Sequence, residues 1–273
     1  MFEAHASYTY EQARDIQSLT SSTATSNWRF GRALVGDQYS QNLDRSRFEL
    51  PHRIAAYGTF TFSTRTDASI IYLGRSGSNY DFVYGGSGGL GDLNADGAQG
   101  NDLIYLPADV AKDDEIRFSG FSPIPGADNS PAAQEQRIAE QRSALERFIT
   151  STDCLTRQRG RLMTRNSCRS PWTNTVNLSL RQALPAIRGQ SILLQLDVFN
   201  FLNLLNSSWG QQPLPPLGGG SVPLLTHVGQ TSGALTGANG SQGVFTFDPA
   251  TEKYDRRHLG SAYQMQFGVR YAF

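Results

Sequence analysis

Apolar and polar residues alternate along several stretches of the chain, and the last of these stretches ends the sequence. The final residues read YQMQFGVRYAF, with apolar side chains at every second position. Because successive side chains of a β-strand point to opposite faces, this segment would present one apolar face and one mainly polar face. The apolar set is Tyr263, Met265, Phe267, Val269, Tyr271 and Phe273. We therefore predict a two-faced strand at the end of the sequence.

The same alternation predicts further strands. It is regular in residues 2–12, 52–63, 172–184 and 191–203, and less regular in residues 68–84, where Gly74 and Gly77 interrupt it. Shorter candidates are residues 222–228 and 243–247. The pattern thus predicts about seven or eight strands, and several of them approach the ~9–11 residues that a tilted strand needs to cross a bilayer.

The predicted connections are of two sizes. Short polar turns are expected around Asp67 and at residues 185–189, whereas residues 85–170 and 209–255 are long, mostly aperiodic and rich in Gly, Pro, Ser and Asn. A compact soluble domain rarely contains excursions of this length. Short turns on one side and long loops on the other are typical of outer-membrane barrels.

One helix is predicted inside the first long loop, over residues 130–152. Ser130 can cap its first turn, and Pro131 fits the first helical position. Its apolar side chains recur at helical spacing and form one stripe, which consists of Ile138, Leu145, Phe148 and Ile149. We expect this stripe to pack onto the loop itself or onto the mouth of a barrel.

The composition narrows the protein class only in part. The chain has 273 residues and no net charge, and 38% of its residues are hydrophobic. A balanced charge argues against nucleic acid as a partner. The sequence has no run of eighteen apolar residues and no basic and apolar leader, which predicts neither a transmembrane helix nor a signal peptide. A transmembrane β-barrel has an average hydropathy similar to that of a soluble protein. The alternation of apolar and polar residues therefore has to distinguish the two classes.

Two readings of the alternating strands stay open. The apolar parity could face lipid, with the polar parity facing a lumen, or it could pack on the core of a soluble sheet. The repeated pattern, the long loops and the aromatic last residue favour the first reading: an all-β fold that contains a segment of an antiparallel transmembrane β-barrel. The alternatives are a soluble, secreted β-sandwich or calcium-stabilised binding module, and a small adhesin or structural barrel that closes with eight strands.

Several motifs carry a family resemblance. The terminal strand ending in Phe273 resembles the signal read by the barrel assembly machinery, and residues 197–203 (DVFNFLN) resemble a strand of TonB-dependent receptors. More specific are residues 91–107 (GDLNADGAQGNDLIYLP), 159–172 (RGRLMTRNSCRSPW) and 204–210 (LLNSSWG). In this order the motifs resemble the C-terminal part of Oar-like TonB-dependent outer-membrane transporters, over essentially the whole chain.

The resemblance implies a location and partners. It implies the outer membrane of a Gram-negative cell, with membrane lipid and the barrel assembly machinery as partners. Family members are several times longer, with a signal peptide, a carboxypeptidase-regulatory-like domain, a plug and a barrel of about twenty-two strands. We find none of these upstream parts and expect Met1 to begin a truncated reading frame. TonB would then be reached only through a missing plug, and residues 1–273 would supply wall and loops without transporting alone.

One loop segment matches the first half of a calcium-binding loop. Asp92, Asn94, Asp96 and Gly97 fit D-x-N-x-D-G, in which oxygen ligands at alternate positions surround a hard cation and the glycine permits a sharp turn. The twelfth position is Leu103 instead of Glu, and Asp102 is the candidate substitute. The alternative is a polar Asx-type turn without metal. Calcium is the only cofactor that the sequence suggests.

The two cysteines, Cys154 and Cys168, both lie in the first long loop. A disulfide between them would close a loop of about fifteen residues and contribute roughly 3 kcal/mol by the chain-entropy model. The cell surface is oxidising enough to keep such a bond. A zinc site would need two more ligands, which no nearby His or C-x-x-C supplies. The disulfide is favoured over two free thiols.

Other candidate chemistry is weak, and we expect no enzyme. The four histidines are scattered, and neither G-x-S-x-G nor H-E-x-x-H occurs. Gly86, Gly88 and Gly91 match G-x-G-x-x-G, but the following DLNADG cannot start the helix that a dinucleotide site needs. Arg181 and Asp197 are expected to form an ion pair in the lumen. A run of arginines could line the barrel mouth or meet lipopolysaccharide phosphates, or it could form a solvated loop; it comprises Arg157, Arg159, Arg161, Arg165 and Arg169.

Overall fold

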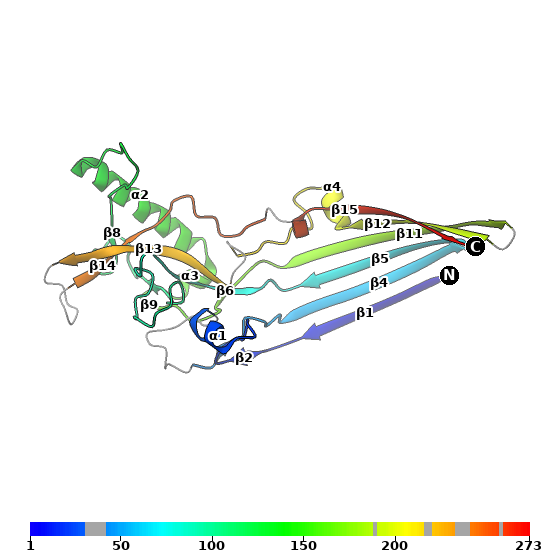
Figure 1. Ribbon diagram of the computed structural model, residues 1–273, viewed down its shortest axis with the longest axis horizontal. Helices are drawn as coiled ribbons and strands as arrows, with labels where there is room; N and C mark the ends of the chain where they lie inside the picture. The colour runs from blue at the N-terminus through cyan, green and yellow to red at the C-terminus, as the bar shows by residue number, and fades with distance from the viewer. Residues whose placement is uncertain (31–41, 188–189, 216–219, 233–240, 257–258) are drawn as a thin grey trace.

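The protein is mostly β-structure and has two regions along its long axis. The computed structural model describes residues 1–30, 42–187, 190–215, 220–232, 241–256 and 259–273. One region is a long six-stranded sheet that ends near both chain termini, and the other is a head built from the long loops (Figure 1). The predicted loop 209–255 lies partly outside the described residues.

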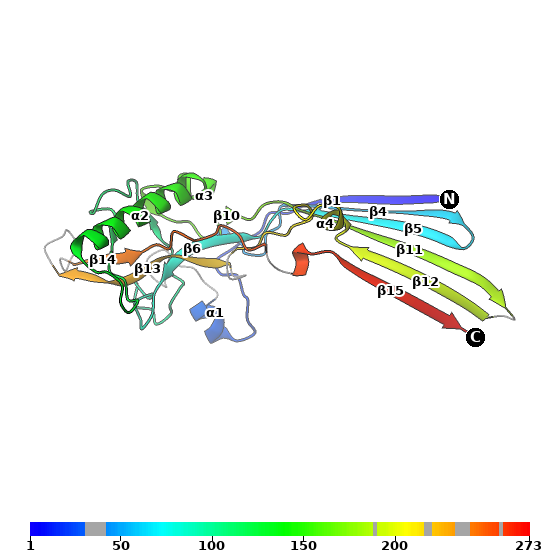
Figure 2. The same cartoon turned by 90° about the horizontal axis from the view of Figure 1, so that it is seen from above.

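The long sheet is antiparallel throughout. Its strands, in spatial order, are β1 (Phe2–Tyr10), β4 (His52–Ser63), β5 (Thr66–Arg75), β11 (Thr173–Ile187), β12 (Gln190–Phe199) and β15 (Gln264–Ala272). Each strand therefore pairs with its predecessor or successor among these six. The sheet is open, because β1 and β15 are its two edges and do not pair with each other (Figure 2).

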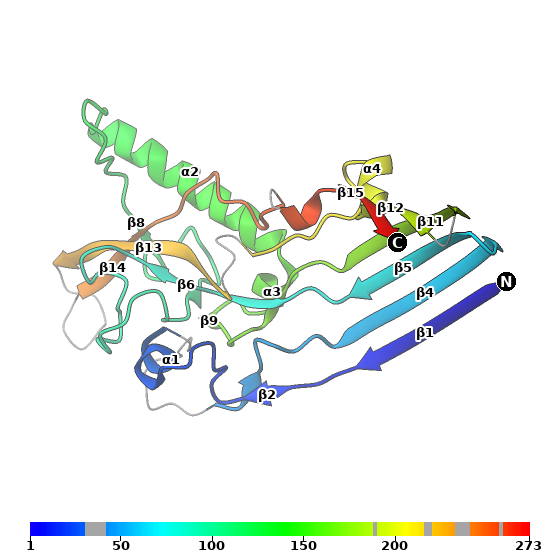
Figure 3. The ribbon, with the colours of Figure 1, turned by 45° about the vertical axis from the view of Figure 1, so that its right-hand side comes forward.

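The head contains a second, mixed sheet. Its five strands, in spatial order, are β10 (Cys168–Arg169), β6 (Asn79–Gly85), β13 (Ser221–Ser232), β14 (Ser241–Thr246) and β8 (Arg117–Phe118). Helices α2 (Pro131–Thr150) and α3 (Asp153–Thr156) lie beside this sheet, as Figure 3 shows.

Small elements complete the described chain. Two short pairs connect parts of the head, namely β2 (Arg14–Asp15) with β3 (Asp44–Arg45), and β7 (Tyr105–Leu106) with β9 (Arg161–Leu162). Helix α1 (Ala24–Phe30) follows β2. Helix α4 (Phe201–Leu205) and a 3-10 turn (Leu259–Ser261) lie at the head end of the long sheet (Figure 1).

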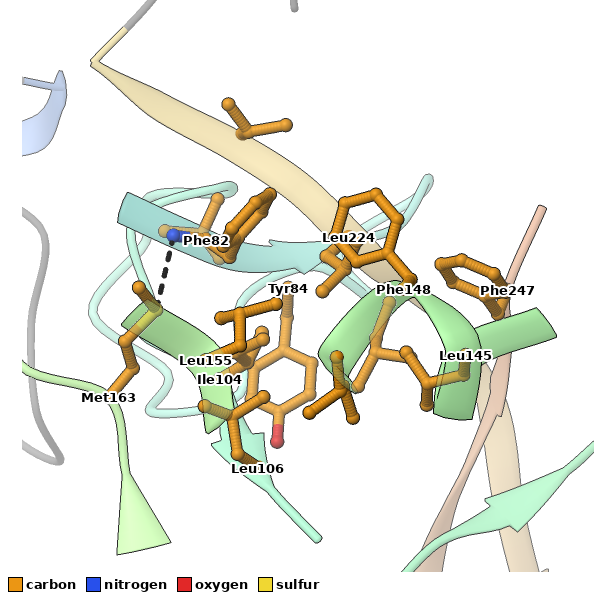
Figure 4. Close-up of a cluster of buried hydrophobic side chains, with 14 of the residues drawn as sticks. Phe82, Tyr84, Ile104, Leu106, Leu145, Phe148, Leu155, Met163, Leu224 and Phe247 are labelled. Carbon is orange, nitrogen blue, oxygen red and sulfur yellow. Dashed lines mark hydrogen bonds between the residues drawn. The ribbon is translucent and has the colours of Figure 1, made fainter. Parts of the chain in front are cut away.

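The only extended apolar core of the described residues lies in the head. Phe148 on α2 packs edge-on against Phe82 on β6, with ring centroids 5.7 Å apart, and against Phe247, 5.8 Å away. Leu145, Leu155 and other buried side chains surround them (Figure 4). Burying such side chains contributes on the order of 1.5–3 kcal/mol each, so the head has the core that a water-exposed domain needs.

The predicted loop helix is confirmed. It spans Pro131–Thr150, and the Ser130 hydroxyl accepts a hydrogen bond from the amide of Ala133. The buried face includes Leu145, Phe148 and Ile149. It packs into the core of the head, where its partners include Phe82 on β6 and Phe247 from the second long loop, and not only residues of its own loop.

Several predicted strands have different bounds in the structure. Strand β11 continues to Ile187, into the turn that was predicted at residues 185–189. The stretch 68–84 divides into β5 and β6, because Gly77 passes so close to the Ser170 carbonyl that a Cβ would lie 2.1 Å from that oxygen. The stretch 191–203 ends as a strand at Phe199, since Asn200 adopts a left-handed conformation with φ 53° and α4 begins after it. The short strands predicted at 222–228 and 243–247 belong to the head sheet.

Among the helices of the described residues, none combines the length and the apolar character needed to cross a membrane.

Candidate functional site

The apolar parity of the long sheet forms one continuous face, because the register aligns it across all six strands. One row of directly opposed residues runs Phe2, Phe60, Ala68, Leu180, Leu196 and Phe267. The next row toward the head runs Ala4, Gly58, Ile70, Leu178, Val198 and Met265. A shift of one residue in any pair would break these rows, so the register is well specified.

Most of this face is uncovered in the described structure, although Val198 near its head end is buried. Phe267 is 67% exposed and Leu180 in the sheet centre is 45% exposed, whereas Leu145 in the head core is 0% exposed. Soluble monomers rarely expose a contiguous apolar area of this kind, and such areas mark contacts with protein or membrane. The long sheet is therefore the candidate functional surface.

Aromatic residues gather toward both ends of the apolar face. Tyr8, Tyr10 and Tyr263 lie at the head end, and Phe62, Tyr271 and Phe273 lie toward the opposite end. At the head end the Asn174 side-chain oxygen accepts hydrogen bonds from the Tyr72 hydroxyl at 2.8 Å and from Nε1 of Trp172 at 2.9 Å. Rings of this amphipathic type are enriched where membrane meets water.

The opposite face carries hydrogen-bonded polar side chains. Thr59 and Ser69 bond across β4 and β5 at 2.9 Å, and the Thr61 hydroxyl donates to Asp67 at 2.8 Å. Near the N-terminal edge, His5 Nε2 lies 3.0 Å from Glu3 Oε1, on the parity predicted for both residues. The sheet thus has a polar face on which several side chains are hydrogen-bonded to one another, opposite a largely uncovered apolar face.

The expected ion pair between Arg181 and Asp197 does not form, although their strands are neighbours as predicted. The register places Arg181 opposite Gln195 and Asp197 opposite Ser179, so the two charges are offset by two positions. Asp197 instead accepts a hydrogen bond from Nε2 of Gln195 at 2.7 Å. The neighbouring strands could be predicted from the sequence, but the register between them could not.

The candidate calcium loop folds as a tight turn whose side chains bond to its own backbone. Asp92 accepts from the amides of Asp96 and Gly97 at 3.0 and 2.9 Å, which is the Asx-type arrangement expected without metal. Asp102 accepts from the Leu93 amide at 2.8 Å. Burial raises the pKa of Asp102, and the charges of Asp96 and Asp92 raise it further.

Metal ligation in this loop stays a prediction. Within the part of the chain that the structure describes, no three or more His, Cys, Asp or Glu side chains are grouped so that they could hold a metal ion. Asn94, the third residue of the motif, contributes its side-chain oxygen to the Asp96 amide at 3.0 Å. The carboxylates of Asp92, Asp96 and Asp102 nevertheless lie close enough for their charges to interact.

The two cysteines are joined in a disulfide. The Cα atoms of Cys154 and Cys168 lie 5.2 Å apart, which is ordinary for this bond. Cys154 belongs to α3 and Cys168 to β10, so the bond attaches the helical part of the first long loop to the head sheet. The segment between them carries four arginines of the run noted in the sequence.

The glycines of the G-x-G-x-x-G match lie in a tightly folded loop, without the following helix that a dinucleotide site needs. Gly86 lies so close to Gly91 that a Cβ on Gly86 would lie 2.4 Å from the Gly91 amide nitrogen, and Gly88 has φ 62°. The residues that follow, up to Leu103, form turns, bends and a bridge without a helix. The three histidines that the structure describes do not converge either: His5 and His52 are on the long sheet, and His227 is in the head. His258 lies outside the described residues.

A polar cavity of about 420 Å³ lies in the head, and sequence reasoning missed most of it. It is lined by Arg14 and Arg45 from the short pair β2 and β3, and by Arg157, Arg161 and Arg165 from the disulfide-closed segment. Only the last three belonged to the noted run. The segments that meet here are more than one hundred residues apart, so no local signal connects them.

Searches against family models, curated proteins and solved structures returned no match.

Proposed function

We propose that the long sheet forms part of the wall of an outer-membrane β-barrel of the TonB-dependent receptor type, and that the head is its extracellular loop region. The observation that carries this proposal is the continuous and largely uncovered apolar face of six registered strands. An apolar face in water loses the stabilisation that burial provides, on the order of 25 cal/mol per Å². Lipid supplies the missing environment.

The dimensions of the sheet agree with this proposal. Its strands have between 9 and 15 residues, against the ~9–11 that a tilted strand needs to span the hydrocarbon. Aromatic side chains such as Tyr10 and Trp172 at the head end, and Phe62 and Phe273 at the far end, correspond to the two interfacial girdles of such barrels. The polar face, with Thr59, Ser69 and Gln195, would then face a water-filled interior.

The open edges place a condition on the proposal. β1 and β15 each have a partner on one side only. In hydrocarbon an unpaired backbone amide or carbonyl costs several kcal/mol, so a sheet edge is not stable there. The wall is therefore complete only when further strands pair with both edges.

The role in transport rests on the resemblance of the loop motifs to Oar-like transporters. Residues 91–107 and 159–172, which carry the most specific motifs, both lie in the head, beyond the end of the proposed membrane-spanning part. In that family substrate is bound by extracellular loops and plug, and TonB acts on the plug. The chain would contribute wall and loops, with the barrel assembly machinery reading its terminal strand.

The soluble β-sandwich is the less favoured alternative. A sandwich buries its apolar parity against a second sheet about 10 Å away. In the described residues the second sheet belongs to the head and packs with α2, leaving Phe267 and Leu196 without a facing layer.

Fluorescence quenching tests the proposal on adjacent residues of one strand. In a background with Trp28, Trp172 and Trp209 changed to Phe, a single tryptophan is placed by Phe267→Trp or, as the matched control, by Gln266→Trp. After reconstitution into vesicles, brominated acyl chains should quench the tryptophan at 267 and aqueous iodide the tryptophan at 266. Iodide quenching at both positions, or a chain that stays folded and monomeric in detergent-free buffer, would contradict lipid contact.

A further inference from the structure

The polar cavity of the head, here called the arginine pocket, has a strong excess of positive charge. Its charged lining consists of five arginines and two carboxylates: Arg14, Arg45, Arg157, Arg161, Arg165, Asp44 and Glu49. Glu49 is already engaged, because its Oε2 lies 3.0 Å from Nε of Arg45 and 2.7 Å from Nη2 of Arg169. The protein therefore leaves guanidinium charge in this pocket that its own carboxylates do not neutralise.

Arg165 supplies a second, independent observation at this pocket. Its side chain is 5% exposed, and its Nη2 is held by the carbonyl and Oδ1 of Asp15, the latter at 3.0 Å. Its Nη1 is buried and has no hydrogen-bond partner among the described residues. A buried, unpaired donor on a charged group is costly, so native proteins almost always give it an acceptor.

The disulfide positions the outer part of the pocket. Cys154 is itself a lining residue, and the bond to Cys168 closes the segment that carries Arg157, Arg161 and Arg165. Within this segment Nη2 of Arg161 donates to the Arg157 carbonyl at 2.8 Å. The closed segment thus holds its arginines against the wall formed by β2 and β3.

We propose that the arginine pocket binds a compact phosphate-bearing anion. Guanidinium groups pair with phosphate through two parallel hydrogen bonds, and a phosphate group concentrates about two negative charges at neutral pH. The cavity of about 420 Å³ has room for more than one such group. The phosphate could belong to a soluble molecule or to a lipid headgroup, because Gln12 and Arg14 follow closely after the end of β1 at Tyr10. This site lies in the head and does not depend on the environment of the long sheet.

Calorimetric titration with pyrophosphate tests the site on the full chain in a zwitterionic detergent at constant ionic strength. The wild-type protein should bind pyrophosphate, and the affinity should fall as salt is raised. The double variant Arg157→Gln/Arg161→Gln should bind at least tenfold more weakly, with an unchanged unfolding temperature, because both arginines are exposed. The matched control is Arg147→Gln/Arg256→Gln, which removes the same charge outside the pocket and should bind as the wild type does.

Two results would overturn the proposal: no binding of pyrophosphate at millimolar concentration by the folded wild type, or an equal loss in both double variants. Adding phosphatidylcholine vesicles with and without a diphosphorylated lipid separates the two sources of phosphate. Competition with pyrophosphate by the phosphorylated vesicles alone assigns the site to a headgroup, and its absence assigns the site to a soluble anion. Either assignment supports phosphate binding, whether or not the sheet proves to contact lipid.

Discussion

The long sheet and the head use apolar residues in opposite ways. In the head, Phe82, Leu145 and Phe148 are enclosed by a mixed sheet and helices. In the long sheet, Phe60, Leu180 and Phe267 are arranged in strict rows and left uncovered. Both regions obey the same backbone rules, since each is hydrogen-bonded β-structure.

The difference is the one expected if the two regions have different surroundings, as the proposed function requires. A region that must fold in water needs its apolar surface removed from water, and the head meets this condition by itself. The long sheet meets the other requirements of a stable sheet, namely register, alternation and paired polar side chains, but not this one. The missing component has to come from outside the described chain.

The largest effect is expected in the head core. Leu145→Ala removes a fully buried side chain between Phe148 and its neighbours and should lower the free energy of unfolding by about 2–5 kcal/mol. Leu180→Ala, on the uncovered face, should leave unfolding of the head unchanged. Denaturant unfolding followed by near-ultraviolet circular dichroism checks both. An equal effect of the two substitutions would mean that sheet and head share one core.

The second-largest effect is expected from an arginine placed on one or the other face of β12. In vesicles, Leu196→Arg should cost about 2–4 kcal/mol of sheet stability, as expected for an arginine in the middle of a lipid-facing strand. The neighbouring Gln195→Arg, on the polar face, should cost much less. Urea titration of the vesicle-bound protein, read by protection of the sheet from protease, gives both values. Similar costs for both changes would argue against a lipid-facing side.

Removal of the disulfide should affect the head alone. Cys154→Ser/Cys168→Ser opens a loop of about fifteen residues and should lower head stability by roughly 3 kcal/mol. Amide hydrogen exchange should rise in α3 and β10 and remain slow in β5 and β11. Faster exchange throughout the long sheet would show that the two regions unfold together.

A pH dependence should likewise belong to the head. Burial raises the pKa of Asp81 on β6 from 3.8 to about 6, against the opposing effect of hydrogen bonds from Ser221 and Asn166 and of the charges on Arg165 and Arg47. The folded state therefore holds a proton that the unfolded chain has released, and head stability should fall as the pH rises from about 4 to about 6.

Asp81→Asn should remove this slope. Thermal unfolding measured across the same pH range checks it. A slope that persists unchanged in the variant would assign the proton to another group.

The smallest effect concerns the start of α2. Ser130→Ala removes the side-chain acceptor of the Ala133 amide and should cost roughly 0.5–1 kcal/mol, confined to the first turn. Ser143→Ala, exposed within the same helix, is the control. Hydrogen exchange at the first amides of α2 should increase only in the first variant.

Most strands of the long sheet could be predicted from the sequence, because the alternation of apolar and polar residues is a direct consequence of strand geometry. The segments containing Tyr8, Phe60, Leu180, Leu196 and Phe267 were all recognisable in this way. The register was not, since it arises from contacts between strands. For this reason the pairing of Arg181 with Asp197 was wrong, although the neighbouring strands were right.

The head was the part that local patterns described least well. Its helix has a cap and a stripe, and both are local signals. Its sheet joins β6 to β13, which are more than one hundred residues apart, and fully buried short strands do not alternate. The arginine pocket was missed for the same reason, because Arg14 and Arg165 meet only through the folding of distant segments.

Strand direction in the long sheet limits how it can be completed. β1 runs toward the head, and β15 runs away from it (Figures 1 and 2). A further strand that pairs antiparallel with β15 must run toward the head, and one that pairs antiparallel with β1 must run away from the head. Any fully antiparallel ring closed through these two sides therefore adds an even number of strands. A ring made from several copies of this chain would also add strands in even numbers, because each copy contributes six. All of its heads would lie on the same side of the ring.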